Sequence, residues 1–333
     1  MKLTGERMLG FPFSSNRGDD NMAQSGSELA PMKRSFRRKR LRENAAGLFF
    51  ISPWLIGFLL LMFGPMVFSL GISFTEWNMV GSPKFIGLEN YIHMFTSDPF
   101  YFKSMIVTFK YVFIMVPLQV VFAILIAVLL NRATYGIKFF RSIFYLPSLI
   151  QGVTLALIFS WMLNDDFGPV NYMLELVGLP RVHWLTDPNV ALYALIFIAL
   201  WGVGSPMVLY LSALRSVSSE YYEAADMDGA GPIRKFFNIT IPLITPTILF
   251  NILTSLISAF QTIVLAFVLT GGGPANSTYF YSLHVYRNAF THFKMGYASA
   301  MAWVMFVLIV LLTGLVLASS KYWVHYEDDG GGR

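Results

Sequence analysis

The sequence of 333 residues contains no cysteine and few charged residues. Without cysteine the chain can form no disulfide, use no thiolate to hold a metal and offer no cysteine nucleophile. Only 13% of the residues are charged, whereas soluble domains carry about 25%. Hydrophobic residues make up 55% of the chain and its mean hydropathy is +0.57. A composition of this kind is typical of a protein that lies largely in a membrane.

Six stretches are long and apolar enough to cross a bilayer, which takes about 20 residues of helix. Their apolar character is continuous rather than alternating, so a β-barrel is excluded, and an open sheet is too costly in hydrocarbon. The sequence therefore predicts an all-α, polytopic membrane protein with six transmembrane helices. The predicted spans are residues 48–74, 105–130, 143–163, 190–214, 243–269 and 298–319.

Lys and Arg are distributed unevenly along the chain, and seven of the 24 lie between Lys33 and Arg42, directly before the first span. Positive charge collects on the cytosolic side of membrane proteins. The short connections that would share the side of this cluster are richer in Lys and Arg than those on the other side. We therefore expect both termini in the cytoplasm. The same placement accounts for the net charge of +5, so we expect no nucleic-acid partner.

The segments outside the spans divide the chain into three parts. Residues 1–44 contain no apolar core of a signal peptide and are expected to form a disordered, basic cytosolic tail. Residues 45–320 form the predicted transmembrane domain, and residues 321–333 form a cytosolic C-terminal tail. The sequence leaves the start of translation open between Met1, Met22 and Met32.

A polar segment, EYYEAADMDGAGPIRKFFNITIP (Glu220–Pro242), lies between the fourth and fifth spans. The two serines before it can cap a helix whose first turn holds Glu220. Gly229 gives the backbone freedom for a turn, and Pro232 suits the first position of a second helix. The segment is thus predicted to be a short helix–turn–helix on the cytosolic surface. It can cap the two spans or bind a cytosolic protein, and both interpretations stay open at this point.

The same segment resembles the cytoplasmic loop of ABC-importer permeases, whose pattern is EAA, three residues, Gly, nine residues and Ile-x-Leu-Pro. Here it reads Glu223-Ala224-Ala225, then Gly229, then Ile239-Thr240-Ile241-Pro242, with Ile241 in place of Leu. Other stretches resemble the carbohydrate-uptake branch of that family, and LTGGGP is typical of its F-type subunit. The resemblance covers residues 45–320. Its stretches are FISPWLIGF, FIGLENY, RSIFYLPSLI, LTGGGP and GYASAMAW.

The resemblance implies a role for this loop in transport. In ABC importers the loop is a coupling helix that seats in a cytosolic ATPase and moves the spans between inward- and outward-facing states. The positions that match, or lie within, the motif are the predicted ATPase-coupling residues. They are Glu223, Ala224, Ala225, Asp228, Gly229, Ile239 and Pro242.

The resemblance also implies an assembly in a bacterial inner membrane. The expected partners are a second, G-type permease, a homodimeric ATPase, an extracytoplasmic solute-binding protein and a carbohydrate, which we expect to be an oligosaccharide. The chain contains no GxxxxGK[ST] phosphate-binding loop. We therefore expect it to catalyse no reaction and to bind no cofactor or metal, with ATP and Mg²⁺ bound by the ATPase.

Polar residues inside the spans are candidates for a substrate path, because they are costly in lipid and tend to face a wet cavity. In the fifth span, the polar residues from Asn251 to Thr262 share one helical face. Resemblance to sugar permeases implies further positions in the third and fourth spans. The predicted path residues are Ser148, Gln151, Gly204, Met207, Ser258, Gln261 and Thr262. Such side chains can instead join packed helices, and the sequence leaves that alternative open.

Two other functions fit a protein with six spans. A secondary transporter driven by ions usually places an ionisable residue at mid-membrane for coupling, but the six predicted spans contain no Asp or Glu. A membrane enzyme, such as a lipid-linked glycosyltransferase, would need acids or a metal site near the membrane surface. The one cluster of acids lies in Glu220–Pro242, where the resemblance to the coupling loop already accounts for it.

Overall fold

The structure is a computed structural model, and it describes residues 47, 49–132 and 136–325. The whole predicted tail 1–44 and the end of the predicted C-terminal tail therefore lie outside the described residues. Within the described chain, helices dominate, and the two short strands β1 (Thr75–Glu76) and β2 (Lys84–Phe85) pair antiparallel. This confirms the predicted all-α class.

Five helical stretches, two of them with a short break, are long and apolar enough to cross a membrane, and they confirm five of the predicted spans within a few residues at each end. Their flanks carry the polar residues that end each apolar run, which is why the boundaries could be read from composition. The five are Phe49–Ser73, Tyr101–Asn131, Ala191–Ser216, Thr245–Leu269 and Met295–Ser320.

The remaining predicted span is a broken helix rather than a continuous one. Helix α5 (Ile137–Tyr145) continues into a 3₁₀ turn, and α6 (Val153–Met162) follows after a bend of 102°. Pro147 lies in the 3₁₀ turn, and Gly152 has a φ of 68° directly before α6. Proline removes a helical hydrogen bond and a positive φ ends a right-handed helix, so the sequence itself explains the bend.

Residues up to Val67 form one unit and residues from Phe68 onward form another. The first unit contains most of the first span, in which a π-helical stretch (Leu59–Phe63) precedes α2 (Gly64–Ser73). The candidate site lies entirely within the second unit. The other helices of that unit are α3 (Glu89–Thr96), α4 (Tyr101–Arg132), α7 (Pro169–Leu176), α8 (Ala191–Leu200), α9 (Gly204–Ser216), α10 (Ser219–Met227), α11 (Pro232–Lys235), α12 (Ile241–Leu243), α13 (Thr245–Phe260), α14 (Val264–Leu269), α15 (Tyr281–Tyr286) and α16 (Met295–Ser320).

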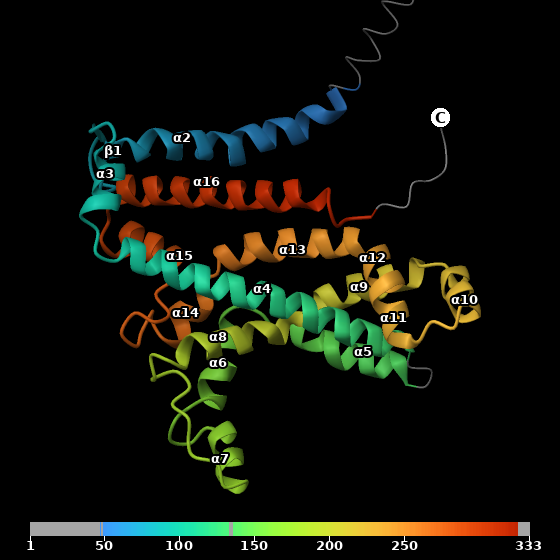
Figure 1. The fold of residues 1–333 in the computed structure, drawn as a ribbon. Helices are drawn as coiled ribbons and strands as arrows, with labels where there is room; N and C mark the ends of the chain where they lie inside the picture. Colours follow the sequence, from blue (N-terminus) through green and yellow to red (C-terminus); the bar gives the residue numbers. More distant parts are fainter. Residues whose placement is uncertain (1–46, 48, 133–135, 326–333) are drawn as a thin grey trace, which may run out of the picture. The chain divides into compact units, whose positions relative to one another are not determined.

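Helix α4 is the central helix of this second unit, because it packs against α8, α9, α13 and α15 (Figure 1). One buried cluster surrounds Tyr111 of α4, with Leu195 of α8 and Phe260 of α13. A second cluster surrounds Ala123, with Met207 of α9 and Ile244. The long apolar helix thus supplies one side of both cores.

Different parts of the chain lie at the two ends of α4. Helices α10 and α11 lie near its C-terminal end, whereas α3 and β1 lie near its N-terminal end (Figure 1). The predicted cytoplasmic segment Glu220–Pro242 and the connection that precedes α4 are therefore at opposite ends of this long helix. This separation is what a membrane between them would require.

Candidate functional site

The polar segment between the fourth and fifth spans folds as the sequence predicts, into two short helices with a turn between them. The Ser218 hydroxyl accepts a hydrogen bond from the Glu220 N–H (3.3 Å) and caps α10. Gly229 ends this helix with a φ of 73°, a conformation that glycine adopts without steric cost. Pro232 then occupies the first position of α11. Capping, glycine and proline chemistry together explain the shape of the segment.

Side-chain contacts fasten the two helices to each other. Lys235 Nζ on α11 donates to Asp226 Oδ1 on α10. The hydroxyls of Tyr222 and Thr240 lie 2.9 Å apart, and Thr240 is buried in the π-helical stretch (Phe236–Thr240) that follows α11. Two independent links across one turn hold the segment in one arrangement, so it can move as a single body.

The outward face of this segment combines acids with apolar side chains. Met227 is 90% exposed, Ile233 73% and Phe237 62%. Of the seven predicted coupling residues, Glu223, Ala224, Asp228 and Gly229 are exposed, whereas Ala225, Ile239 and Pro242 are half-buried. The first four are accessible to another protein, and the other three are partly covered by neighbouring residues. Exposed apolar side chains of this size are typical of an interaction surface.

A cavity of about 590 Å³ lies at the centre of the helices of the second unit. Its wall includes four of the seven predicted path residues, Gln151, Ser258, Gln261 and Thr262. The same face of α13 adds Asn251, Thr254 and Ser255, as the helical spacing predicted. The wall contains no Asp, Glu, Lys, Arg or His from the described part of the chain. The cavity therefore offers hydrogen bonds and apolar surface to a ligand without offering charge.

Three helix breaks meet at this cavity. One is the bend at residues 150–152, one is the 3₁₀ turn Trp201–Val203 between α8 and α9, and one is the interruption at residues 261–263 between α13 and α14. Each break contributes residues to the wall. At membrane depth, irregular backbone is tolerated where it lines a cavity or is buried in protein. The location of the breaks therefore supports a polar passage at this place.

The other three predicted path residues do not line the cavity. The Ser148 hydroxyl is buried and donates to the Tyr145 carbonyl (2.6 Å). A Cβ atom on Gly204 would lie 2.4 Å from the Phe144 carbonyl oxygen, so this glycine allows α9 to pack closely on the end of α5. Met207 is fully buried in the cluster around Ala123. In this structure Gly204 and Met207 pack against neighbouring helices, and the Ser148 hydroxyl satisfies a carbonyl of its own turn.

Sequence reasoning missed one wall of the cavity. Tyr111, Met115 and Gln119 of α4 line it, and their spacing of four residues places them on one face of that helix. In the sequence, Tyr111 and Met115 look like ordinary core residues of an apolar span. Gln119 could have indicated this wall of the cavity, because an amide in the middle of a predicted span is costly unless it faces a cavity or a partner.

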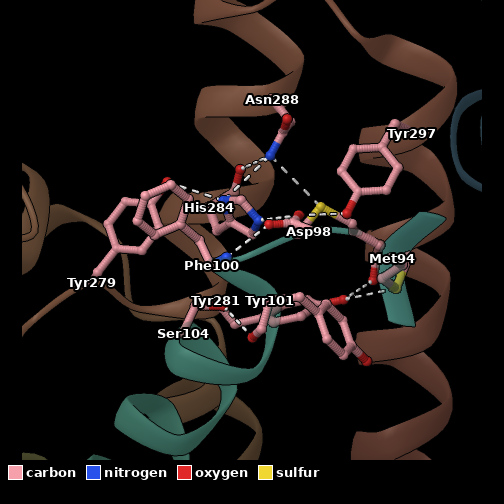
Figure 2. A network of polar contacts seen from close by, with 11 residues as sticks. Met94, Asp98, Phe100, Tyr101, Ser104, Tyr279, Tyr281, His284, Asn288 and Tyr297 are labelled. Carbon is pink, nitrogen blue, oxygen red and sulfur yellow. Dashed lines mark hydrogen bonds and ion pairs between the residues drawn. The ribbon is translucent and has the colours of Figure 1, made fainter. Parts of the chain in front are cut away.

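A network of buried polar side chains lies at the opposite end of α4 from α10 and α11. Asp98, just before α4, lies between His284 of α15 and Tyr297 of α16 (Figure 2). His284 Nε2 is 2.7 Å from Asp98 Oδ2, and the Tyr297 hydroxyl donates to the same oxygen. The Phe100 N–H donates to Asp98 Oδ1 (2.9 Å). The Tyr279 hydroxyl lies 3.0 Å from His284 Nδ1.

The protonation states in this network follow from its geometry. Burial raises the pKa of the Asp98 carboxyl, but the three hydrogen bonds that it accepts outweigh burial and hold this pKa below its usual value. Burial also lowers the pKa of His284, and the nearby Asp98 offsets this only in part. Asp98 is therefore an anion and His284 a neutral imidazole at neutral pH. Consequently His284 donates from Nε2 and accepts from Tyr279 at Nδ1.

The same region contains three of the chain's five histidines, a grouping that could indicate a metal site. His93, His284 and His292 all line a cavity of about 380 Å³ beside Asp98. Among residues 49–132 and 136–325, however, no three His, Asp or Glu side chains are placed so that they could hold a metal ion. The network connects three helices through mutual hydrogen bonds instead.

Comparison with known proteins gives relatives over nearly the whole chain. Residues 48–324 match the family described as binding-protein-dependent transport system inner membrane component. The probable ABC transporter permease protein YesP of Bacillus subtilis is 44% identical over 92% of this chain and 99% of that protein. The multiple sugar-binding transport system permease protein MsmF of Streptococcus mutans is 34% identical, over 85% of this chain and 98% of that protein.

The fold also matches a solved structure. A chain in the crystal structure of a bacterial alginate ABC transporter, in complex with an alginate pentasaccharide-bound periplasmic protein, superposes with a TM-score of 0.74. The two chains are 24% identical, and the match covers 85% of this chain and 96% of that one. This likeness confirms the arrangement of helices.

Proposed function

The chain belongs to the family of inner membrane components of binding-protein-dependent transport systems, in its carbohydrate-uptake branch, and we propose that it is the F-type permease of an oligosaccharide importer. In this proposal the six spans alternate between inward- and outward-facing states. Hydrolysis of ATP on a separate, homodimeric ATPase drives the change, and this chain itself binds neither ATP nor Mg²⁺. A ligand alone could not drive uphill transport, because it shifts an equilibrium only by its differential affinity for two states.

The observation that carries this proposal is the helical segment α10–α11, whose helices are linked by side-chain hydrogen bonds and whose outer face is exposed. The links from Lys235 to Asp226 and from Tyr222 to Thr240 hold its two helices together. Glu223 and Asp228 face outward beside exposed apolar side chains. A segment of this kind can seat in a cleft of the ATPase and pass on movement without bending. We propose that it is the coupling helix and lies in the cytoplasm, with both termini on the same side.

We propose that the central cavity is the sugar path. Its wall of amides, hydroxyls and apolar side chains suits the hydroxyl groups and apolar faces of a sugar. Gln151, Ser258, Gln261 and Thr262 would contact the substrate in this proposal, whereas Ser148, Gly204 and Met207 would support the helices around it. A homologous G-type permease would complete the path. An extracytoplasmic binding protein would deliver sugar at the end that contains the Asp98 network.

The energy source and the substrate can be tested together. Cells that express the chain with its partners are offered a panel of radiolabelled neutral and acidic oligosaccharides. We expect uptake of at least one of them that depends on this chain, survives a protonophore and stops when ATP is depleted. Uptake that stops with the protonophore while ATP is maintained would instead support an ion-driven secondary transporter.

The coupling role predicts a complete loss of uptake when the exposed face of the segment is changed. Glu223→Lys reverses an exposed charge, and Gly229→Arg places a side chain at a positive φ that L-residues rarely adopt. We expect either change to abolish uptake while the chain still inserts into the membrane, because the segment no longer fits the ATPase. The measurement is uptake together with co-purification of the ATPase. Asp166→Lys, an exposed acid at the start of another connection, is the control and should leave co-purification unchanged.

A further inference from the structure

One polar side chain in the wall of the central cavity has an oxygen atom that lacks a partner among the described residues. Gln119 lies in α4, two residues after Pro117, in the middle of a mostly apolar span. Its side chain lines the cavity. Its Oε1 atom is shielded from solvent and accepts no hydrogen bond from residues 49–132 or 136–325.

An unpaired buried amide oxygen is a cost that a protein rarely retains without a reason. Most buried polar atoms have at least one hydrogen-bond partner, and an unsatisfied one destabilises the folded state. A leucine at this position would fill a similar volume without that cost. The amide is therefore better explained by a partner in the cavity, toward which the end of the side chain can rotate, than by the stability of the empty protein.

A second glutamine in the same wall shows the contrast. Gln151 donates from Nε2 to the Ser148 carbonyl (2.7 Å) and so stabilises the bend between α5 and α6. Both amides line the cavity, but Gln151 is already engaged by the backbone. The Oε1 atom of Gln119, in contrast, has no hydrogen-bond partner among the described residues.

The neighbours of Gln119 indicate which chemistry it would meet. One and two turns before it on α4, Met115 and Tyr111 border the same cavity but are almost fully buried, so they add only a small apolar surface beside the amide. An amide can both donate and accept hydrogen bonds, as a sugar hydroxyl can. A wall that combines an amide with mainly apolar neighbours matches a sugar ring, which has both hydroxyl groups and apolar faces.

We propose that Gln119 binds hydroxyl groups of the carbohydrate in the central cavity and thereby makes α4 a part of the substrate-binding wall. The proposal rests on the proposed sugar path, and it adds a helix and a residue that neither sequence reasoning nor the comparisons assign. Because the amide oxygen makes its hydrogen bond only with substrate, Gln119 determines specificity without contributing to the stability of the fold.

Stability of the purified complex separates a binding role from a structural one. We expect Gln119→Leu to leave the Tm unchanged or to raise it, because the substitution removes an unsatisfied polar atom. Gln151→Leu is the matched control and should lower the Tm, because it removes a hydrogen bond that the structure contains. A larger fall in Tm for Gln119→Leu than for Gln151→Leu would overturn the proposal.

The absence of cysteine from the chain allows a second measurement that needs no known substrate. Single-cysteine variants of the full complex are treated with the membrane-impermeant reagent trimethylammonium-ethyl methanethiosulfonate, which reacts with thiolates in water. We expect Gln119→Cys to react about tenfold faster than Val121→Cys, since Val121 is exposed on another side of α4 and would face lipid. Gln261→Cys serves as the reference for the proposed path.

The labelling results distinguish a failure of this inference from a failure of the proposed path. Reaction at both Gln119→Cys and Gln261→Cys supports both. Reaction at Gln261→Cys but not at Gln119→Cys overturns the role of Gln119 and leaves the path in place. No reaction at either position overturns both.

Transport supplies the final measurement once the oligosaccharide panel has identified a labelled sugar that the complex imports. For that probe, Gln119→Leu should raise KM by about tenfold, the upper effect expected for loss of one hydrogen bond. Gln119→Asn, which keeps the amide on a shorter side chain, should lie between Gln119→Leu and the unsubstituted protein. Equal KM values for all three proteins would overturn the proposal.

Discussion

The Asp98 network and the central cavity contain different polar side chains, and the two sets differ in how their hydrogen bonds are satisfied. Around Asp98 the polar groups satisfy each other: the carboxylate accepts from His284, Tyr297 and the Phe100 N–H. Around the cavity, Gln119 Oε1 has no partner in the described chain. The helical bundle thus contains one region whose polar groups satisfy each other and one in which a buried polar atom has no partner among the described residues.

This difference shows how polar residues in a membrane protein can be assigned to structure or to function. A buried polar group is stabilising only when its hydrogen bonds are made. In the Asp98 network the partners come from α15, α16 and the loop before α4, so the network fastens helices that are far apart in sequence. In the cavity the missing partners are expected to come from a ligand. Substitutions in the two regions, and at one packing glycine, test this distinction.

Asp98→Asn should give the largest loss of stability. The amide has the same shape as the carboxylate but no charge, and its NH₂ group would face donors instead of accepting from them. Hydrogen bonds to a charged group contribute about 1.5–3 kcal/mol each, and we expect a loss of about 3 kcal/mol in the free energy of unfolding. The measurement is denaturation of the purified protein in detergent.

The control for this change is Asp166→Asn, at an exposed aspartate. A surface substitution of this kind should change stability by less than about 0.5 kcal/mol. If both variants lose the same small amount, the Asp98 network does not fasten the helices and the contrast with the cavity disappears.

Gly204→Ala should give the next largest effect and tests whether this predicted path residue is a packing residue. Its new Cβ would lie 2.4 Å from the Phe144 carbonyl oxygen, so α9 and the end of α5 would have to separate. Overpacking of this kind costs about 2 kcal/mol. Gly202→Ala is the matched control, since a Cβ at that position would meet nothing within 4 Å. Equal stabilities of the two variants would mean that Gly204 is not needed for close packing.

Gln261→Leu should have a smaller effect, and on transport instead of stability. Gln261 lies at the break between α13 and α14 and lines the cavity. Loss of one hydrogen bond to substrate should reduce uptake by about tenfold, with the Tm unchanged. Ile257→Ala, on α13 but outside the cavity wall, should leave uptake unaffected. A lowered Tm with normal uptake would assign Gln261 to packing.

Features that depend on nearby residues could be predicted from the sequence. Five spans follow directly from continuous apolar runs, and the α10–α11 segment follows from a serine cap, Gly229 and Pro232. The polar face of α13 follows from helical spacing. In each case the physical cause lies within one or two helical turns of the residue concerned.

Features that depend on contacts between distant residues could not be predicted. Asp98 and His284 are 186 positions apart in sequence, and neither lies in a recognisable motif. Pro147 and Gly152 explain why the third span is broken, but the angle of 102° between its two halves could not be predicted from them. Gly204 and Met207 were predicted as path residues by resemblance to sugar permeases, and their position outside the cavity wall of this structure depends on how neighbouring helices pack, which the sequence does not show.

The smallest expected effect is a change of stability with pH, and it also concerns the Asp98 network. His284 has a pKa below its ordinary value of about 6.5, so on acidification the unfolded chain takes up a proton before the folded protein does. Stability should therefore fall as the pH is lowered below about 6.5. The pKa of Asp98 is also lowered, so a further fall should follow below about pH 4. Melting curves between pH 7.5 and 5.5 measure the first change.

His284→Asn should remove the first change, because asparagine does not titrate. The neighbouring charged and titratable groups, Asp98, Tyr279, Arg287, His292 and Tyr297, remain in this variant and provide the background. If the unsubstituted protein instead becomes more stable between pH 7.5 and 5.5, His284 forms a charged pair with Asp98 in the folded state. The contact between His284 and Asp98 would then be an ion pair and not a hydrogen bond from a neutral imidazole.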